Sequence, residues 1–121
     1  MSFFRAIPIG VHGAIEVLAA PLLLVAPFVL GFSYAAGAIS IALGVLLIGL
    51  AVSIYGGEGE RGTVPLTAHA GLDHVLATIT IVLGIALGIT GDSVAAIFMV
   101  GFGSAHMALT ASTRYSRPLG T

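Results

Sequence analysis

The sequence predicts an all-α, four-helix transmembrane bundle built from two tandem helical hairpins, and its composition is the first reason. Of the 121 residues, 58% are hydrophobic and only 7% are charged, and the mean hydropathy is +1.15. A soluble domain has about 25% charged residues, and a chain of about 120 residues cannot bury so much apolar surface in its own interior. The composition therefore excludes a water-soluble protein and favours one embedded in the lipid bilayer.

Four apolar segments are long enough to cross a membrane, for which a helix needs about 20 residues. These segments are Ile7–Phe32, Ala35–Tyr55, Pro65–Thr90 and Ser93–Thr113. Each is expected to be helical, because a helix satisfies its own backbone hydrogen bonds where there is no water. The turns at Ser33-Tyr34 and Gly91-Asp92 are so short that each must join two antiparallel helices.

The first span contains two prolines. Pro21 and Pro27 lack a backbone N–H, so they are expected to kink the helix and to free the carbonyl groups of Val17 and Leu23. A bend that improves packing is the simpler interpretation, although the discontinuous helices of transporters have similar breaks.

The other three spans are rich in small residues. The glycines of interest are Gly44, Gly49, Gly84, Gly88, Gly101 and Gly103. Gly84 and Gly88 match the motif that lets two membrane helices approach closely, within the bundle, in a homo-oligomer or in a larger membrane complex. Thr78 and Thr80 are expected to bond to backbone carbonyls one turn earlier in the third span.

The four arginines predict the orientation. Arg5 precedes the first span, Arg61 lies between the second and third, and Arg114 and Arg117 follow the fourth. Basic residues accumulate on the cytoplasmic side of membrane proteins, so both termini are expected to be cytoplasmic. The chain has no lysine and a net charge of −1, which excludes nucleic-acid binding. Because it has no cysteine, thiolate metal sites and disulfides are excluded as well.

A shift of about 57 positions superimposes the two halves of the chain, which indicates an internal repeat. Both halves contain a proline, then a histidine, then an acidic residue. The aligned pairs are Pro8 with Pro65, His12 with His69, and Glu16 with Asp73. Histidine and acidic residues are rare here, four and five in the whole chain, so these matches are informative. We expect a single integral membrane domain over 1–121, with repeats at about 7–55 and 65–113.

The first repeat resembles a known family. Ala26-Pro27-Phe28, together with Ile7-Pro8 and the His12 and Glu16 pair, is similar to the SPW-repeat membrane proteins. These are small bacterial chains with two transmembrane helices per repeat and a Ser-Pro-Trp motif. Only the proline of that motif is present here, and the second repeat lacks it at Leu83-Gly84-Ile85. The resemblance implies the repeated hairpin architecture and a bacterial plasma membrane, but no activity.

Ionisable residues within the spans form the candidate site, because burying such groups in lipid is costly. They are His12, Glu16, His69, Asp73, His74 and His106. His12 and Glu16 are four residues apart, as are His69 and Asp73, so each pair projects from one helix face. At about 1.5 Å per residue, all six lie in the cytoplasmic half of the membrane.

Imidazole and carboxylate groups together favour Zn, Fe or Mn as a bound metal ion. His12, Glu16, His69 and Asp73 are the main candidate ligands, and His74 and His106 are expected to assist. Histidines of this set (His12, His69 and His106) could instead ligate a haem axially, with the carboxylates orienting their outer ring nitrogens. The leading functional hypothesis is therefore a membrane protein that binds a metal ion or haem.

Two other functions fit the same residues. In a structural or assembly protein, the polar cluster would fix helix packing and the glycine faces would dock other membrane subunits. In a proton- or ion-conducting protein, histidine would carry protons, since it titrates near physiological pH. An enzyme is not expected, because no nucleophile with a neighbouring base is recognisable.

Overall fold

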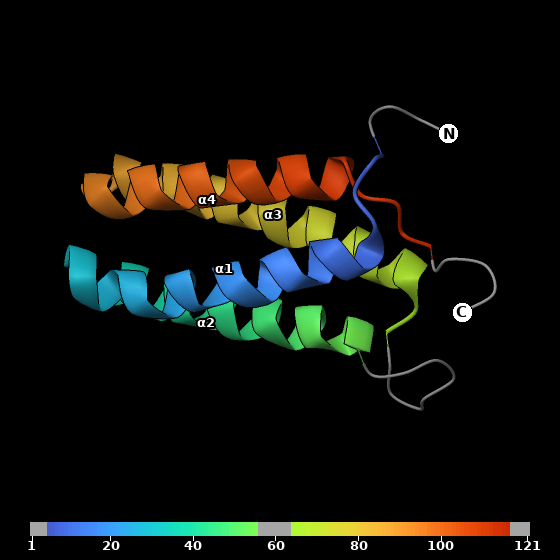
Figure 1. Ribbon diagram of the computed structural model, residues 1–121. Helices are drawn as coiled ribbons and strands as arrows, with labels where there is room; N and C mark the ends of the chain where they lie inside the picture. The colour runs from blue at the N-terminus through green and yellow to red at the C-terminus, as the bar shows by residue number, and fades with distance from the viewer. Residues whose placement is uncertain (1–4, 56–63, 117–121) are drawn as a thin grey trace.

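The computed structural model describes residues 5–55 and 64–116 and confirms the all-α bundle. Four helices lie side by side (Figure 1), and α1 packs against α2 while α3 packs against α4. The helices are α1 (Ile9–Leu30), α2 (Tyr34–Val52), α3 (Leu66–Ile89) and α4 (Ser93–Ala111), with a short 3₁₀ helix, η1 (Ser53–Tyr55), continuing α2. The molecule therefore consists of two helical hairpins, as the sequence predicts.

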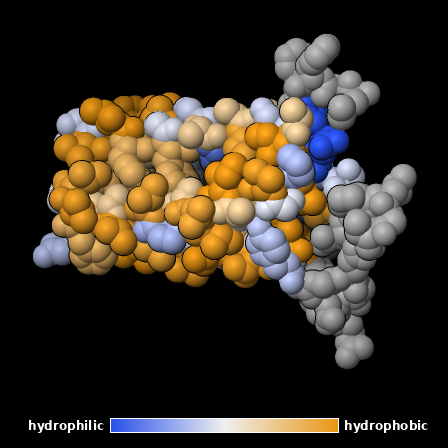
Figure 2. Space-filling model, in the orientation of Figure 1, coloured by the Kyte–Doolittle hydropathy of each residue, from blue (hydrophilic) through white to orange (hydrophobic). Residues whose placement is uncertain are grey.

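The helices have the length and surface of membrane spans. The four candidate spans contain 19 to 24 residues each and are apolar enough to cross a bilayer. Large apolar side chains point outward, and Leu18, Phe28 and Ile97 are each more than three-quarters exposed. Figure 2 shows that apolar residues cover most of the helical surface on this side of the molecule. Such a surface is favourable only when lipid covers it.

The start of α1 and the end of α4 lie at the same end of the bundle (Figure 1). The backbone joins them, because the Ile7 N–H donates to the Ser112 carbonyl at 3.0 Å and the Arg114 N–H donates to the Ile7 carbonyl at 2.9 Å. Arg61, between the second and third predicted spans, lies outside the described residues, as does Arg117. Of the four arginines, Arg5 and Arg114 are thus placed by the structure, both at this end.

The two hairpin turns meet at the opposite end of the bundle. Asp92 precedes α4 and accepts the backbone N–H of Ala95 through Oδ1 at 3.1 Å, as a helix N-cap does. Its Oδ2 accepts the Ser33 N–H from the other hairpin at 2.8 Å. These N–H donors, Ser33 first, lower the pKa of the Asp92 carboxyl below its ordinary value of 3.8. One side chain therefore caps a helix and links the two hairpins.

Helix α1 runs without interruption through Pro21 and Pro27. The carbonyl of Leu23, which Pro27 was predicted to free, accepts a hydrogen bond from Ser40 Oγ of α2 at 2.6 Å. In lipid a partner of this kind is needed, because there is no water to satisfy the carbonyl. The proline is thus accommodated by the packing of α1 on α2.

The predicted small residues divide into two groups. Gly84, Gly88 and Gly103 lie where α3 meets α4, and a Cβ on Gly103 would come within 3.0 Å of the Ile81 backbone nitrogen. Gly44 faces Leu24 of α1 in the same way. Gly49 and Gly101 have open space beside them. The first group therefore serves close packing within the hairpins.

The predicted hydrogen bonds of the third-span threonines are confirmed. Thr78 Oγ1 donates to the His74 carbonyl at 2.8 Å, and Thr80 Oγ1 donates to the Leu76 carbonyl at 2.7 Å. Both hydroxyls are thus satisfied within α3.

Candidate metal centre

Two helices each bring one histidine and one carboxylate to the interior. In α1, His12 Nε2 lies 3.0 Å from Glu16 Oε2, and in α3, His69 Nε2 lies 3.1 Å from Asp73 Oδ2. All four side chains are at most 1% exposed. The four-residue spacing thus places each pair on one helix face, as predicted.

The two pairs meet across the boundary between the hairpins. His12 Nε2 of α1 lies 2.9 Å from Asp73 Oδ2 of α3, and His69 Nε2 of α3 lies 3.5 Å from Glu16 Oε1 of α1. One ligand atom from each of the four residues lies within 4.8 Å of the other three. The equivalent residues of the two repeats therefore form one cluster instead of two separate sites.

His106 joins this cluster from α4, whereas His74 does not. His106 Nε2 lies 2.7 Å from Glu16 Oε2 and 3.6 Å from Asp73 Oδ1. His74 is exposed, and its Nδ1 is bonded to the Ala70 carbonyl at 2.8 Å. His74 follows Asp73 directly in α3. Side chains of consecutive residues point about 100° apart around a helix, so His74 does not share the face of Asp73. A shared depth in the membrane therefore does not bring His74 to the centre.

Two residues after α4 complete the surroundings of the cluster, and sequence reasoning did not identify either as part of it. Thr113 Oγ1 lies 2.7 Å from His12 Nδ1, and the Tyr115 hydroxyl donates to Asp73 Oδ2 at 2.8 Å. Burial raises the pKa of the Tyr115 hydroxyl above its ordinary value of 10.0, which keeps its proton available for donation. The backbone pairing of Ile7 with Ser112 and Arg114 positions this segment, and no spacing pattern in the sequence indicates it.

Thr113 determines which nitrogen of His12 carries the proton. The single hydroxyl proton of Thr113 is donated to the Leu109 carbonyl at 2.7 Å, so Oγ1 can only accept from the His12 ring. His12 Nδ1 must therefore be the protonated nitrogen, and a neutral ring then has its lone pair on Nε2. This arrangement is typical of metal-binding histidines, whose outer nitrogen is held by a hydrogen-bond acceptor.

Several polar atoms of the cluster are buried without a hydrogen bond. Glu16 Oε1, Asp73 Oδ1 and both ring nitrogens of His69 are buried and make no hydrogen bond. Glu16 Oε1, Asp73 Oδ1 and His69 Nε2 each lie 3.1 to 3.6 Å from a nitrogen or oxygen of the opposite charge type. These contacts are not aligned for hydrogen bonding. Unsatisfied buried groups are costly, and a cation bound here would satisfy Glu16 Oε1, Asp73 Oδ1 and His69 Nε2, while His69 Nδ1 would keep the ring proton.

The spacing of the atoms also suits a metal ion. Contacts between the histidine nitrogens and the carboxylate oxygens range from 2.7 to 3.6 Å. Ligands at about 2.0–2.2 Å from a metal ion are separated from one another by roughly 2.9–3.5 Å. Two carboxylates would also neutralise a divalent cation, which matters at a site surrounded by lipid. These separations are compatible with one divalent ion, and they also fit histidine–carboxylate ion pairs without a metal.

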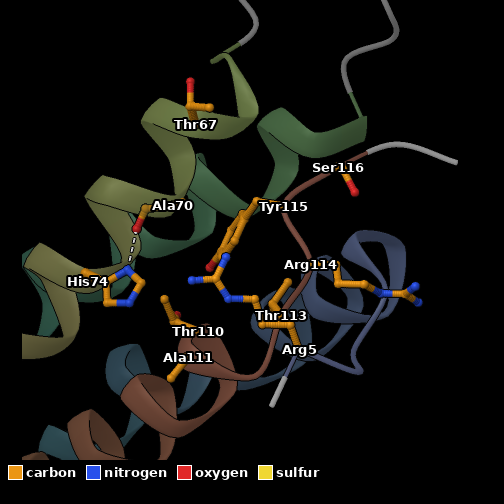
Figure 3. A pocket seen from close by; sticks show the side chains of 10 residues that line it. All are labelled: Arg5, Thr67, Ala70, His74, Thr110, Ala111, Thr113, Arg114, Tyr115 and Ser116. Carbon is orange, nitrogen blue, oxygen red and sulfur yellow. Dashed lines mark hydrogen bonds between the residues drawn. The ribbon is translucent and has the colours of Figure 1, made fainter. Parts of the chain in front are cut away.

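A polar pocket adjoins the cluster at the end of the bundle where α1 begins. It has a volume of about 440 Å³, and its lining includes Arg5, Thr67, His74 and Tyr115. Figure 3 shows the Arg5 side chain directed toward His74 and Tyr115, whereas the Arg114 side chain points the other way. Tyr115 both lines this pocket and bonds to Asp73, so its ring separates the cluster from the polar end of the molecule.

The chain matches no protein-family model, no curated protein and no solved structure. The resemblance to SPW-repeat proteins therefore stays a prediction, and function has to be argued from the site itself.

Proposed function

We propose that this chain is an integral membrane protein that binds one divalent transition-metal ion among His12, Glu16, His69 and Asp73, with His106 as a further ligand. The supporting observation is the convergence of three Nε2 atoms and two carboxylates in the buried centre of the bundle. The ion would satisfy Glu16 Oε1, Asp73 Oδ1 and His69 Nε2, which are buried without a hydrogen bond, and would be neutralised by the two carboxylates.

Zn, Fe and Mn are the metals that this mixture of nitrogen and oxygen ligands favours. Haem is the less favoured cofactor, because Asp73 Oδ2 lies 2.9 Å from His12 Nε2 and 3.1 Å from His69 Nε2. That oxygen occupies the space where a macrocycle between two axial histidines would pass. The arginines at the end where α1 begins support a cytoplasmic location for both termini, and the ion would then lie in the cytoplasmic half of the membrane.

A structural function is the second candidate, because the same cluster connects the two hairpins. His12 with Asp73, and Glu16 with His106, are contacts between different repeats. Without a metal, protonated histidines paired with the carboxylates would hold the hairpins together in the same place. This candidate requires no ion, so metal content distinguishes it from the first.

The test is elemental analysis of the full chain purified in detergent, after incubation with Zn²⁺, Fe²⁺ or Mn²⁺ and removal of the unbound ion. We expect about one ion per chain in the wild type and at least tenfold weaker binding in His69→Ala. His74→Ala is the matched control, because it removes an exposed histidine of the same helix, and it should bind metal normally.

Two outcomes would contradict the proposal. A wild-type protein that binds none of the three metals, but is destabilised by His69→Ala, would favour the structural function. A strong Soret band in the absorption spectrum of the purified protein would favour haem.

A further inference from the structure

The polar pocket at the end of the bundle where α1 begins contains a positive charge. Its volume of about 440 Å³ is typical of sites for small ligands. Two arginines, Arg5 and Arg114, belong to its lining, and none of the described residues that line it is acidic. Because the Arg5 side chain points toward His74 and Tyr115 while that of Arg114 points away (Figure 3), Arg5 is the cation that faces the pocket.

Arg5 has no carboxylate partner among the described residues. These residues include three acidic side chains, of which Glu16 and Asp73 face the histidines of the buried cluster. The third, Asp92, bonds to Ser33 at the opposite end of the bundle. A guanidinium group presents several N–H donors in a fork that matches the oxygens of a phosphate group. The pocket is therefore suited to an anion, and a phosphate group is the best geometric match for Arg5.

An apolar groove continues from this pocket along the outer face of α3. It is lined by His74, Val75, Thr78 and Ile79 and has a volume of about 240 Å³. His74 lines both the pocket and the groove, so the two adjoin. Val75 and Ile79 are 51% and 40% exposed. At about 1.5 Å per residue, the groove extends roughly 7 Å farther from this end of the bundle than His74 does, into the part of the helix that lipid surrounds.

We propose that the pocket and the groove together bind one anionic phospholipid. Its phosphate group accepts hydrogen bonds from the Arg5 guanidinium, and one acyl chain lies against Val75 and Ile79. Basic pockets between membrane helices are typical sites for acidic lipid headgroups. A zwitterionic headgroup fits less well, because the lining has no carboxylate to pair with its ammonium group. A soluble phosphate would fill the pocket and leave the groove empty. The inference does not depend on the proposed metal ion.

The test measures saturable binding of radiolabelled phosphatidylglycerol to the immobilised full chain in detergent, with unlabelled lipids as competitors. Phosphatidylcholine with the same acyl chains is the matched control, because it has the same phosphate group but no net charge. We expect it to compete at least tenfold less well than phosphatidylglycerol. Equal competition by the two lipids would overturn the proposal, since the groove would then bind any lipid through its chains.

Inorganic phosphate, compared with chloride at equal ionic strength, distinguishes a lipid from a soluble anion. It lacks an acyl chain, so we expect it to compete at least a hundredfold less well than phosphatidylglycerol. Competition as strong as that of the lipid would assign the pocket to a soluble phosphate compound and overturn the assignment of a lipid.

Two arginine variants locate the site. Arg5→Gln should weaken phosphatidylglycerol binding at least tenfold, because it removes the guanidinium group that faces the pocket. Arg114→Gln removes the same charge from the same end of the bundle, but from a side chain that points away, and should leave binding within about threefold of the wild type. Equal losses in the two variants would indicate unspecific attraction of acidic lipids. That result, or no loss in Arg5→Gln, would overturn the proposal.

Discussion

At the scale of single residues, Thr113 has the clearest effect on the proposed site. It lies outside the helices, yet it fixes the proton of His12 on Nδ1 and so directs the Nε2 lone pair toward the carboxylates. Residues that hold the outer nitrogen of a ligand histidine commonly change metal affinity by about 10–100-fold. Thr113 should therefore act as a positioning residue for metal binding.

We expect Thr113→Val to weaken metal binding by about 10–100-fold, because valine keeps the shape of the side chain but cannot accept the His12 proton. The measurement is a competition titration with a coloured chelator. Thr78→Val is the control, since Thr78 is exposed and bonds only to the His74 carbonyl. Equal affinities for Thr113→Val and the wild type would show that the Thr113 contact has no effect on the metal.

The sequence predicts one part of this site and not the other. His12, Glu16, His69 and Asp73 follow from a four-residue spacing, which is a local property of a helix, and from the repeat. Thr113 depends on how the chain turns after α4 and pairs with Ile7, and such a contact between distant segments leaves no pattern in the sequence. In the sequence, His74 is a candidate ligand only because it lies at the same depth in the membrane as Asp73. Its position around the axis of α3 directs its side chain outward.

At the scale of helices, α3 and α4 are held together by close backbone approach. A Cβ on Gly103 would lie 2.7 Å from Ile81 Cγ1 and 3.1 Å from the Ala77 carbonyl oxygen, and one on Gly84 would lie 3.1 Å from the Val100 nitrogen. Backbone atoms cannot move aside as a flexible side chain can. The glycines therefore set the distance between α3 and α4, and with it the position of His106 relative to Asp73.

We expect Gly103→Ala to destabilise the protein by about 1–3 kcal/mol, because the added methyl group overpacks the helix contact. Thermal unfolding in detergent measures the change. Gly101→Ala on the same helix is the control, since no atom lies near its Cβ position, and it should be neutral or slightly stabilising. Equal unfolding temperatures of the two variants would contradict this account of the packing.

The composition predicts that glycine-rich faces pack closely, but it does not predict which glycines do so. Gly101 and Gly103 are two residues apart, and only Gly103 faces α3. The choice depends on the rotation of α4 within the hairpin, which the apolar sequence leaves open because nearly every face of the helix is hydrophobic. The four spans themselves are predicted to within a few residues, since length and hydropathy are properties of the segment alone.

At the scale of the whole molecule, acidic side chains connect the two hairpins toward both ends of the bundle. The buried cluster connects them toward the end where α1 begins, and the contact between Asp92 and the Ser33 N–H connects them at the other end. The first connection consists of contacts between histidines and carboxylates, and the second is a hydrogen bond to the Asp92 carboxylate. Each can be removed separately.

The Asp92 connection predicts a pH dependence. The pKa of Asp92 is lowered in the folded protein, so its contribution to stability is present above its ordinary value of 3.8 and is lost as the pH falls through the lower folded pKa. We expect Asp92→Ala to lower the unfolding temperature at pH 7, and this difference from the wild type should shrink as the pH falls below 3.8. A difference that is constant with pH would show that the carboxylate charge is not involved.

The cluster predicts a dependence on metal. A ligand that binds only the folded state stabilises it, by about 2.7 kcal/mol when present at a hundredfold excess over its Kd. A chelator should therefore lower the unfolding temperature of the wild type and of His74→Ala equally, and should leave His69→Ala unchanged. An unfolding temperature that does not respond to the chelator in any of the three proteins would contradict metal binding at this site.

The division of the cluster between the two repeats has a consequence for biogenesis. His12 and Glu16 enter the membrane with the first hairpin, whereas Asp73, His69 and His106 follow with the second. A newly inserted first hairpin thus has two of the five residues of the site, and these two ionisable groups lie in the bilayer before the other three arrive. Metal binding at the proposed site would then follow insertion of the second hairpin, and a chain arrested before α4 would lack the 2.7 Å contact of His106 with Glu16.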